Sequence, residues 1–190
     1  MTSPSIPDRV PAGATPEGDG IVVGTGPVRV DIFIDFQCPF CQRFELAAAP
    51  ALAGLVADQL ASLVYHPMNF LDEASTTSYS TRAAAASGCA ADRGRFTEYA
   101  HALFVSQPPE GGPGLSDDEL AGLGRDTGLA GPEFAACLSA GAYRDWPSFV
   151  TARAAAAGVG GTPTVLVAGV DAAPDPQAIT AAVAAAAGGH

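Results

Sequence analysis

The stretch FIDFQCPFC, residues 33–41, decides the fold. It places Cys38 and Cys41 directly after an apolar run, residues 28–36, and directly before a segment with helical character. Pro39 cannot donate a backbone hydrogen bond but fits the first turn of a helix, so Cys38 is expected at or near the N-cap. The unpaired N–H groups there favour a thiolate, and we expect the pKa of Cys38 to fall below its ordinary value of about 8.5.

The second cysteine, Cys41, follows one helical turn later on the same face. It can therefore close a small ring with Cys38, or resolve a mixed disulfide between Cys38 and a substrate. A CxxC pair could instead be half of a zinc site, which needs two further ligands. Cys89 and Cys137 are far from the pair and have no nearby Cys or His, so we expect no metal and no cofactor.

A second motif, Gly161-Thr162-Pro163-Thr164, precedes the apolar run of residues 165–167. It puts Pro163 at the mouth of a late strand. On sequence alone, an ordinary turn proline at a strand edge stays an alternative.

Taken together, FIDFQCPFCQRFE (33–45) and GVGGTPTVLV (158–167) resemble the DsbA-like branch of the thioredoxin superfamily, of the actinobacterial type. The resemblance implies an α/β thioredoxin fold with an inserted α-helical domain. It also implies a cis Thr162–Pro163 bond packed against the CxxC, with the Thr162 backbone available to an extended substrate. Client binding would then involve Pro39, Phe40, Thr162 and Pro163.

The long interval between the two motifs accommodates the helical domain. We expect a flexible arm at 1–18, the first half of the core at 19–69, a helical lid at 70–157 and the second half of the core at 158–190. Strands are predicted at 20–23, 28–36, 63–66 and within 165–170, and helices at 75–91, 95–105, 116–127, 132–139, 143–157 and 176–187. The expected order is a βαβ half followed, after the insertion, by ββα.

Composition limits the classes of function. The chain has 190 residues with 48% apolar content, enough for one domain with an insertion and a core that needs no disulfide to fold. Its formal charge of −11 argues against nucleic acid or an anionic membrane surface as a partner. No pattern for self-association is visible, so we expect a monomer.

Cys89 and Cys137 fall in two of the predicted inserted helices. The resemblance implies that they form a structural disulfide, which would stabilise the lid by about 4 kcal/mol in the chain-entropy model and indicate an oxidising compartment. Two buried free thiols are the alternative.

The first 19 residues contain no signal-peptide pattern and no membrane-spanning run. Two interpretations stay open. The protein is extracytoplasmic, in the cell envelope and tethered to the membrane by an anchor absent from this chain, or it is cytoplasmic if Met1 is the true start.

Several side chains near the dithiol are candidate modulators. Related enzymes often have a buried carboxylate where this chain has Ile32; Asp35 could accept the Cys41 proton or merely cap the following loop. His66 ends a predicted strand and could reach the same sheet edge, although a structural role is the usual one. Glu45 is expected at the surface.

Phe40, between the cysteines, carries no charge and no hydrogen-bonding group. We therefore expect a less extreme oxidant than CPHC enzymes, with Cys38 solvent-reachable. Phe40 is expected to form an apolar docking surface with Phe36 and Phe44.

The sequence thus predicts a thiol–disulfide oxidoreductase that acts on unfolded or reduced cysteine-containing clients through Cys38 and Cys41, as a DsbA-like oxidase. The resemblance implies reoxidation by a quinone-linked membrane protein of the DsbB or vitamin K epoxide reductase type. Alternatives are a reductase or isomerase on the same site, a glutathione-transferase-like isomerase, or a non-catalytic binding domain on the thioredoxin scaffold, which would not need both the CxxC and the Thr-Pro loop.

Overall fold

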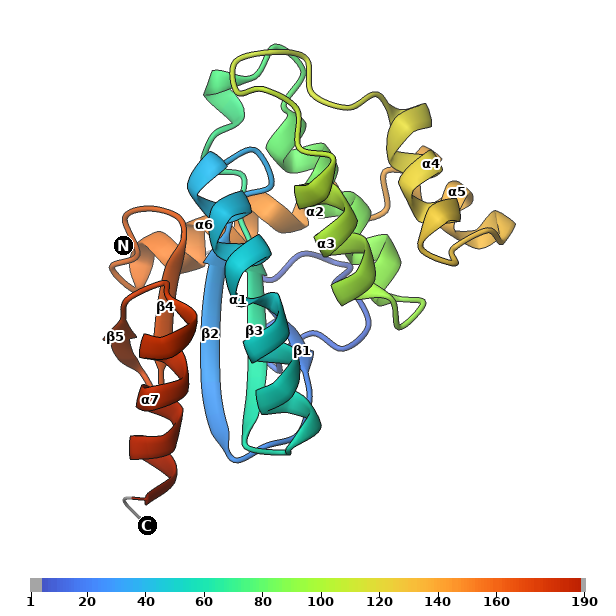
Figure 1. Cartoon of the computed structure of the whole chain (residues 1–190). Coiled ribbons are helices and arrows are strands. Elements are labelled where there is room, and N and C mark those ends of the chain that lie inside the picture. The colour runs from blue at the N-terminus through green and yellow to red at the C-terminus, as the bar shows by residue number, and fades with distance from the viewer. Residues whose placement is uncertain (1–4, 189–190) are drawn as a thin grey trace.

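The computed structural model describes residues 5–188, which form one five-stranded mixed sheet flanked by helices (Figure 1). The strand order is β1-β3-β2-β4-β5. β2 and β3 pair in parallel, and the other neighbours pair antiparallel. The strands span β1 (Ile21–Val23), β2 (Val28–Ile34), β3 (Ala61–Pro67), β4 (Thr164–Val167) and β5 (Val170–Ala172). The α/β class predicted from the sequence is confirmed.

The central strand β2 is apolar almost throughout because helices cover both of its faces. Figure 1 shows α1 (Pro39–Ala57) and α7 (Pro176–Gly188) in front of the sheet and α6 (Trp146–Ala156) behind it. Since β2, α1 and β3 form one βαβ unit, the start of α1 lies beyond the carboxyl end of β2. This edge of the sheet is where the dithiol is placed.

The segment between β3 and β4 is helical, as the periodicity predicts. It contains α2 (Tyr79–Ala91), α3 (Phe96–Val105), α4 (Asp117–Asp126), α5 (Pro132–Ser139) and α6, preceded by a 3-10 turn at Asp72–Ala74. In Figure 1, α2 and α3 stand beside the upper end of the sheet and α4 and α5 lie farther out. We call this segment, residues 70–157, the helical insertion.

The ββα order predicted after the insertion is present. β4 and β5 form a hairpin within the segment predicted as strand, residues 165–170, with Ala168 and Gly169 at the turn. Both residues have positive φ, 49° and 80°, which is the geometry of a tight two-residue hairpin turn. Glycine accommodates this geometry readily, and alternation of apolar residues alone did not reveal the position of the turn.

The predicted flexible arm, residues 1–18, lies outside the described residues at 1–4, and its remainder packs against the helical insertion. The indole N–H of Trp146 donates to the carbonyl of Gly18 at 2.8 Å, and Ala14 forms a bridge with Ile21. Pro11 contacts the helix at Gly88, where a Cβ would come within 2.9 Å of its ring. We call this segment, residues 5–18, the N-terminal strap. Its contacts are made by turns and single residues rather than by an apolar face, so the absence of an apolar period in the sequence did not reveal them.

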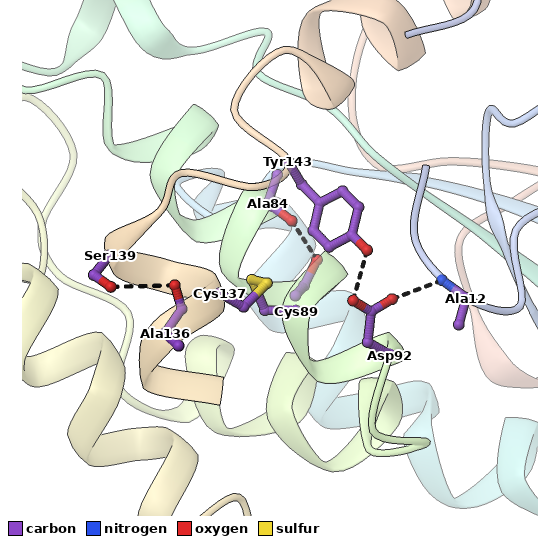
Figure 2. Close-up of a disulfide and its surroundings, with 9 residues drawn as sticks. Ala12, Ala84, Cys89, Asp92, Ala136, Cys137, Ser139 and Tyr143 are labelled. Atoms are coloured by element: carbon purple, nitrogen blue, oxygen red, sulfur yellow. Dashed lines mark hydrogen bonds between the residues drawn. A yellow bond between two sulfur atoms is a disulfide. The ribbon is translucent and has the colours of Figure 1, made fainter. Parts of the chain in front are cut away.

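A disulfide joins Cys89 in α2 to Cys137 in α5, so these cysteines are not two free thiols (Figure 2). Beside it, Asp92 accepts hydrogen bonds from the Tyr143 hydroxyl at 2.6 Å and from the backbone N–H of Ala12 at 2.9 Å. The disulfide and this carboxylate therefore hold α2, α5 and the N-terminal strap together.

Between residues 5 and 188, no helix combines the length and the apolar character that crossing a bilayer would require.

Candidate active site

The two cysteines of the dithiol lie at the amino end of α1, directly after the central strand. Cys38 is the N-cap residue in extended conformation, and Pro39 occupies the first helical turn. Both cysteines are free thiols, and Cys41 is fully buried. The local sequence explains this placement: the strand ends at Ile34, and Pro39 starts a helix without needing a hydrogen-bonded N–H.

The Cys38 thiol contacts the loop before β4. Its Sγ lies 3.4 Å from the carbonyl oxygen of Thr162, and the Thr162–Pro163 peptide bond is cis. Cys38 is 4% exposed, so its sulfur is more enclosed than the sequence analysis expected. The reason is tertiary: the Thr162 loop closes over it from the far end of the chain.

The environment separates the acidities of the two thiols. A hydrogen bond with the Cys41 thiol, helped by the backbone N–H groups of Cys41 and Phe40 and by the Thr162 side chain, lowers the pKa of Cys38 to about 6 against the opposing effect of burial. Burial, together with the neighbouring Cys38 charge, raises the pKa of Cys41 well above its ordinary range. At neutral pH the site thus holds one thiolate and one thiol.

The nearest carboxylate, Asp35, is fully buried and holds three segments together. Its Oδ1 accepts from the backbone N–H of Gln37 at 2.9 Å and from the Ser80 hydroxyl at 2.6 Å, and its Oδ2 accepts from the N–H of Leu71 at 2.9 Å. Burial raises the pKa of Asp35 to about 6, although these hydrogen bonds oppose the rise.

Asp35 therefore does cap the loop that follows the strand, and it also reaches the first inserted helix through Ser80. Sequence reasoning missed Ser80, because nothing local marks a serine in an alanine-rich helix as a partner of a distant carboxylate.

His66 is not brought to the dithiol. Its Nε2 lies 2.8 Å from Asp31 Oδ1 and its Nδ1 lies 2.6 Å from the Asp19 carbonyl, so both ring nitrogens are engaged. Its ring also stacks on Phe33. These contacts hold His66 against β2 and against the segment that precedes β1.

Of the three phenylalanines expected to form a docking surface, only one is exposed. Phe40 is 63% exposed and lies under the Arg43 guanidinium at 4.4 Å. Phe36 and Phe44 are buried in the core, which corrects the prediction for both. Strand and helix periodicity turn them inward, whereas Phe70 and Val105, from the segments flanking the dithiol, are exposed.

The prediction of a surface position for Glu45 is wrong. Glu45 is buried against α3, where its Oε1 lies 3.2 Å from His101 Nδ1. Burial raises the pKa of this carboxyl. The inserted helix α3 covers this face of α1, and the position within α1 alone does not reveal the cover.

No cluster of three or more His, Cys, Asp or Glu side chains suited to a metal ion occurs within residues 5–188. What the site offers chemically is a buried thiol and an adjacent thiolate at a helix start, with a backbone carbonyl edge beside them.

Comparison with known proteins agrees with this geometry. The family described as Thioredoxin matches residues 18–185. Serine/threonine-protein kinase PknE of Mycobacterium tuberculosis is 39% identical over 133 residues, which cover 65% of this chain and 23% of that protein. The chain therefore spans about a quarter of the length of the curated relative it matches.

Solved structures match a larger share of the chain, at somewhat lower sequence identity. The reduced form of a disulfide bond oxidoreductase, DsbG, of Mycobacterium tuberculosis is 32% identical with a TM-score of 0.77, covering 90% of this chain and 88% of that one. Oxidised DsbA of the same organism is also 32% identical, with a TM-score of 0.72 and coverage of 88% and 100%. The predicted thioredoxin fold is thereby confirmed.

Proposed function

Because the chain belongs to the thioredoxin family, as a thiol–disulfide oxidoreductase of the DsbA-like type, we propose that Cys38 and Cys41 exchange disulfides with client proteins, with oxidation of the client as the main direction. The observation that carries this proposal is the pair of free thiols at the amino end of α1, with the Cys38 sulfur 3.4 Å from the Thr162 carbonyl before the cis Pro163 bond. A Cys38 thiolate with a pKa of about 6 is a good leaving group at neutral pH, so client disulfides are released readily.

In the proposed cycle, the oxidised enzyme contains a Cys38–Cys41 disulfide. A client thiolate attacks the Cys38 sulfur, the bond to Cys41 breaks, and Cys41 leaves and takes up a proton, as its raised pKa favours. A second client thiolate then attacks the client sulfur of the mixed disulfide. Cys38 departs as a thiolate, so the client dithiol is oxidised and the enzyme is reduced by the same two electrons.

The surface around the thiol supports a role in client binding. Phe40 is exposed beside Cys38, and the Thr162 carbonyl faces the sulfur, where an extended client backbone could pair with the loop. We assign Pro39, Phe40, Thr162 and Pro163 to this client-binding edge. Cysteine-containing proteins in an unfolded or reduced state are the class of client that such an edge accepts.

Asp35 is proposed as the modulator of the site. Its carboxyl has a pKa of about 6, and the Cys38 charge is one of the influences that raise it, so the two groups repel when both are ionised. We do not extend this role to His66, because both of its ring nitrogens are already engaged.

The cycle needs an acceptor for two electrons. We propose a quinone-linked membrane protein of the DsbB or vitamin K epoxide reductase type, and an extracytoplasmic location for the monomeric enzyme, in keeping with its Cys89–Cys137 disulfide. If a reducing partner acts instead, the same site would run as a reductase or isomerase. The paired thiols favour either direction over a glutathione-transferase-like isomerase.

Two assays compare these directions. Oxidised enzyme should restore disulfides to a reduced multi-cysteine protein, and the reduced enzyme should cleave insulin more slowly than it oxidises that client. Cys38→Ala should abolish both activities. If Cys38→Ala retained full exchange activity, the assignment of the site would be wrong; if insulin reduction dominated and the redox potential were as low as about −270 mV, the direction would be wrong.

A further inference from the structure

Gln107 reaches the dithiol from the helical insertion. It follows α3, and its side-chain Nε2 donates to two backbone carbonyls of the active-site loop, that of Phe36 at 2.9 Å and that of Cys38 at 3.1 Å. The carboxamide therefore bridges the two carbonyls on either side of Gln37. Within residues 5–188, it is the one side chain that donates to the carbonyl of Cys38.

These carbonyls matter because they belong to the residue that carries the reactive sulfur and to the residue two positions before it, and their oxygens carry partial negative charge. A donor that binds them offsets that charge and fixes the loop in the orientation that aims the α1 N–H groups at the thiolate. The side chains of the two residues between the cysteines cannot donate a hydrogen bond to these carbonyls. Pro39 has no backbone N–H to donate, and the Phe40 side chain has no donor at all.

We propose that Gln107 is a positioning residue for the dithiol: by holding the carbonyls of Phe36 and Cys38, it fixes the loop that presents the Cys38 sulfur, and the helical insertion thereby influences the redox potential of the pair. The inference rests on the proposed function only in assigning the potential a role in client oxidation. The contact itself is independent of any client.

A neighbouring amide provides a matched control. Gln42, in α1, donates from Nε2 to the carbonyl of Phe104 at 2.8 Å, and so also ties the insertion to α1. Its side chain touches neither the Phe36 nor the Cys38 carbonyl. Loss of the Gln42 bond loosens the same boundary without removing the donor near the sulfur.

The test compares Gln107→Met, which keeps the length of the side chain without a donor, with Gln42→Met. The thiolate absorbance of the reduced full chain is titrated, and its equilibrium with glutathione is measured. We expect Gln107→Met to raise the Cys38 pKa by about 0.5 to 1 unit and to shift the equilibrium about three- to tenfold toward the oxidised enzyme. Gln42→Met should change neither.

Gln107→Glu should raise the pKa further, because it faces two carbonyl oxygens with a carboxylate. No change in Gln107→Met, or an equal change in both methionine variants, would overturn the proposal. In the wild-type protein, the Gln107 side-chain amide NMR signals should shift with the Cys38 titration, and their failure to do so would also overturn it, whether or not the variants fold.

Failure of the proposed function is a separate result. If Cys38→Ala left client oxidation intact while Gln107→Met still raised the thiol pKa, the positioning role would stand and the client assignment would fall.

Discussion

The Cys38 sulfur and the Thr162 carbonyl oxygen lie 3.4 Å apart although 124 positions separate the two residues in the chain. The contact places the end of the α6–β4 connection against the start of α1. The surroundings of the Cys38 thiol therefore come from two parts of the chain, the β2–α1 junction and the loop before β4. The contact also leaves Cys38 only 4% exposed. Under the proposed function, a client would approach along the Thr162 edge, beside Phe40.

Reduction of the Cys38–Cys41 disulfide should make the free energy of unfolding depend on pH. The folded-state pKa of Cys38, about 6, lies below its unfolded value, so its contribution is fully present above about pH 8.5 and is lost as the pH falls through 6. Urea unfolding of the reduced and oxidised forms should show the reduced form gaining on the order of 3 kcal/mol relative to the oxidised form between pH 6 and 8.5. A pH-independent difference would contradict the lowered pKa.

Asp35→Asn should both destabilise the fold and lower the pKa of the Cys38 thiol. An amide cannot accept all three hydrogen bonds that reach the carboxylate, and we expect a cost of about 1–3 kcal/mol in urea unfolding. Because loss of the carboxylate removes a like charge near Cys38, thiolate absorbance should show a lower Cys38 pKa. Ser80→Ala, which removes one donor and no charge, should leave that pKa near the wild-type value.

The loss of stability caused by Asp35→Asn should also depend on pH. The folded pKa of Asp35 is raised to about 6 from an unfolded value near 3.9, so its contribution to stability is present below about pH 3.9 and is lost as the pH rises through 6. The stability difference between wild type and Asp35→Asn should therefore be larger at pH 4 than at pH 7. An equal difference at both pH values would mean that Asp35 has no raised pKa.

Replacing both Cys89 and Cys137 by serine should lower the free energy of unfolding by about 4 kcal/mol, as the chain-entropy model gives for a loop of this length, which spans 48 positions. Client oxidation at a temperature where the variant stays folded should be unchanged, because the bond lies in α2 and α5 rather than at the dithiol. Chemical denaturation and the client assay, run on the same preparation, separate the two effects. A large loss of activity in the folded variant would be the contrary result.

Phe40→Ala should weaken client binding without destabilising the protein. The side chain is 63% exposed, so its loss costs little packing, but it removes the apolar group beside Cys38 and the Arg43 stacking contact. We expect a severalfold rise in KM for a reduced client, with an unchanged Tm. Phe36→Ala, which truncates a core residue, should instead lower Tm sharply.

The sequence predicted the strand-to-helix junction with the dithiol and the inserted helices more accurately than it predicted the contacts around them. Cys38, Pro39 and Cys41 mark a strand-to-helix junction by residue type alone, and amphipathic spacing located the inserted helices near their observed ends. Two strands were predicted after the insertion, but the position of the turn between them was not, because Ala168 adopts a positive φ that its residue type does not indicate.

Contacts between elements far apart in the chain could not be predicted from the sequence. Glu45 lies under α3, and Asp35 is met by Ser80 from α2, contacts that depend on how distant helices dock. Gln107 is similar: a glutamine in a proline-rich loop gives no local signal that its amide spans two carbonyls near a thiol. The N-terminal strap is bound through Trp146 and Asp92, each far from it in the chain.

Helix α2 carries Ser80 near one end, bonded to Asp35 beside the dithiol, and Cys89 toward the other, bonded to Cys137. They are nine positions apart, about 14 Å along the helix axis. One helix thus connects the surroundings of the Cys38–Cys41 dithiol to a disulfide that persists in an oxidising compartment. In a reducing compartment, reduction of the Cys89–Cys137 bond would lower the free energy of unfolding and shorten the lifetime of the protein, whether or not a client is present.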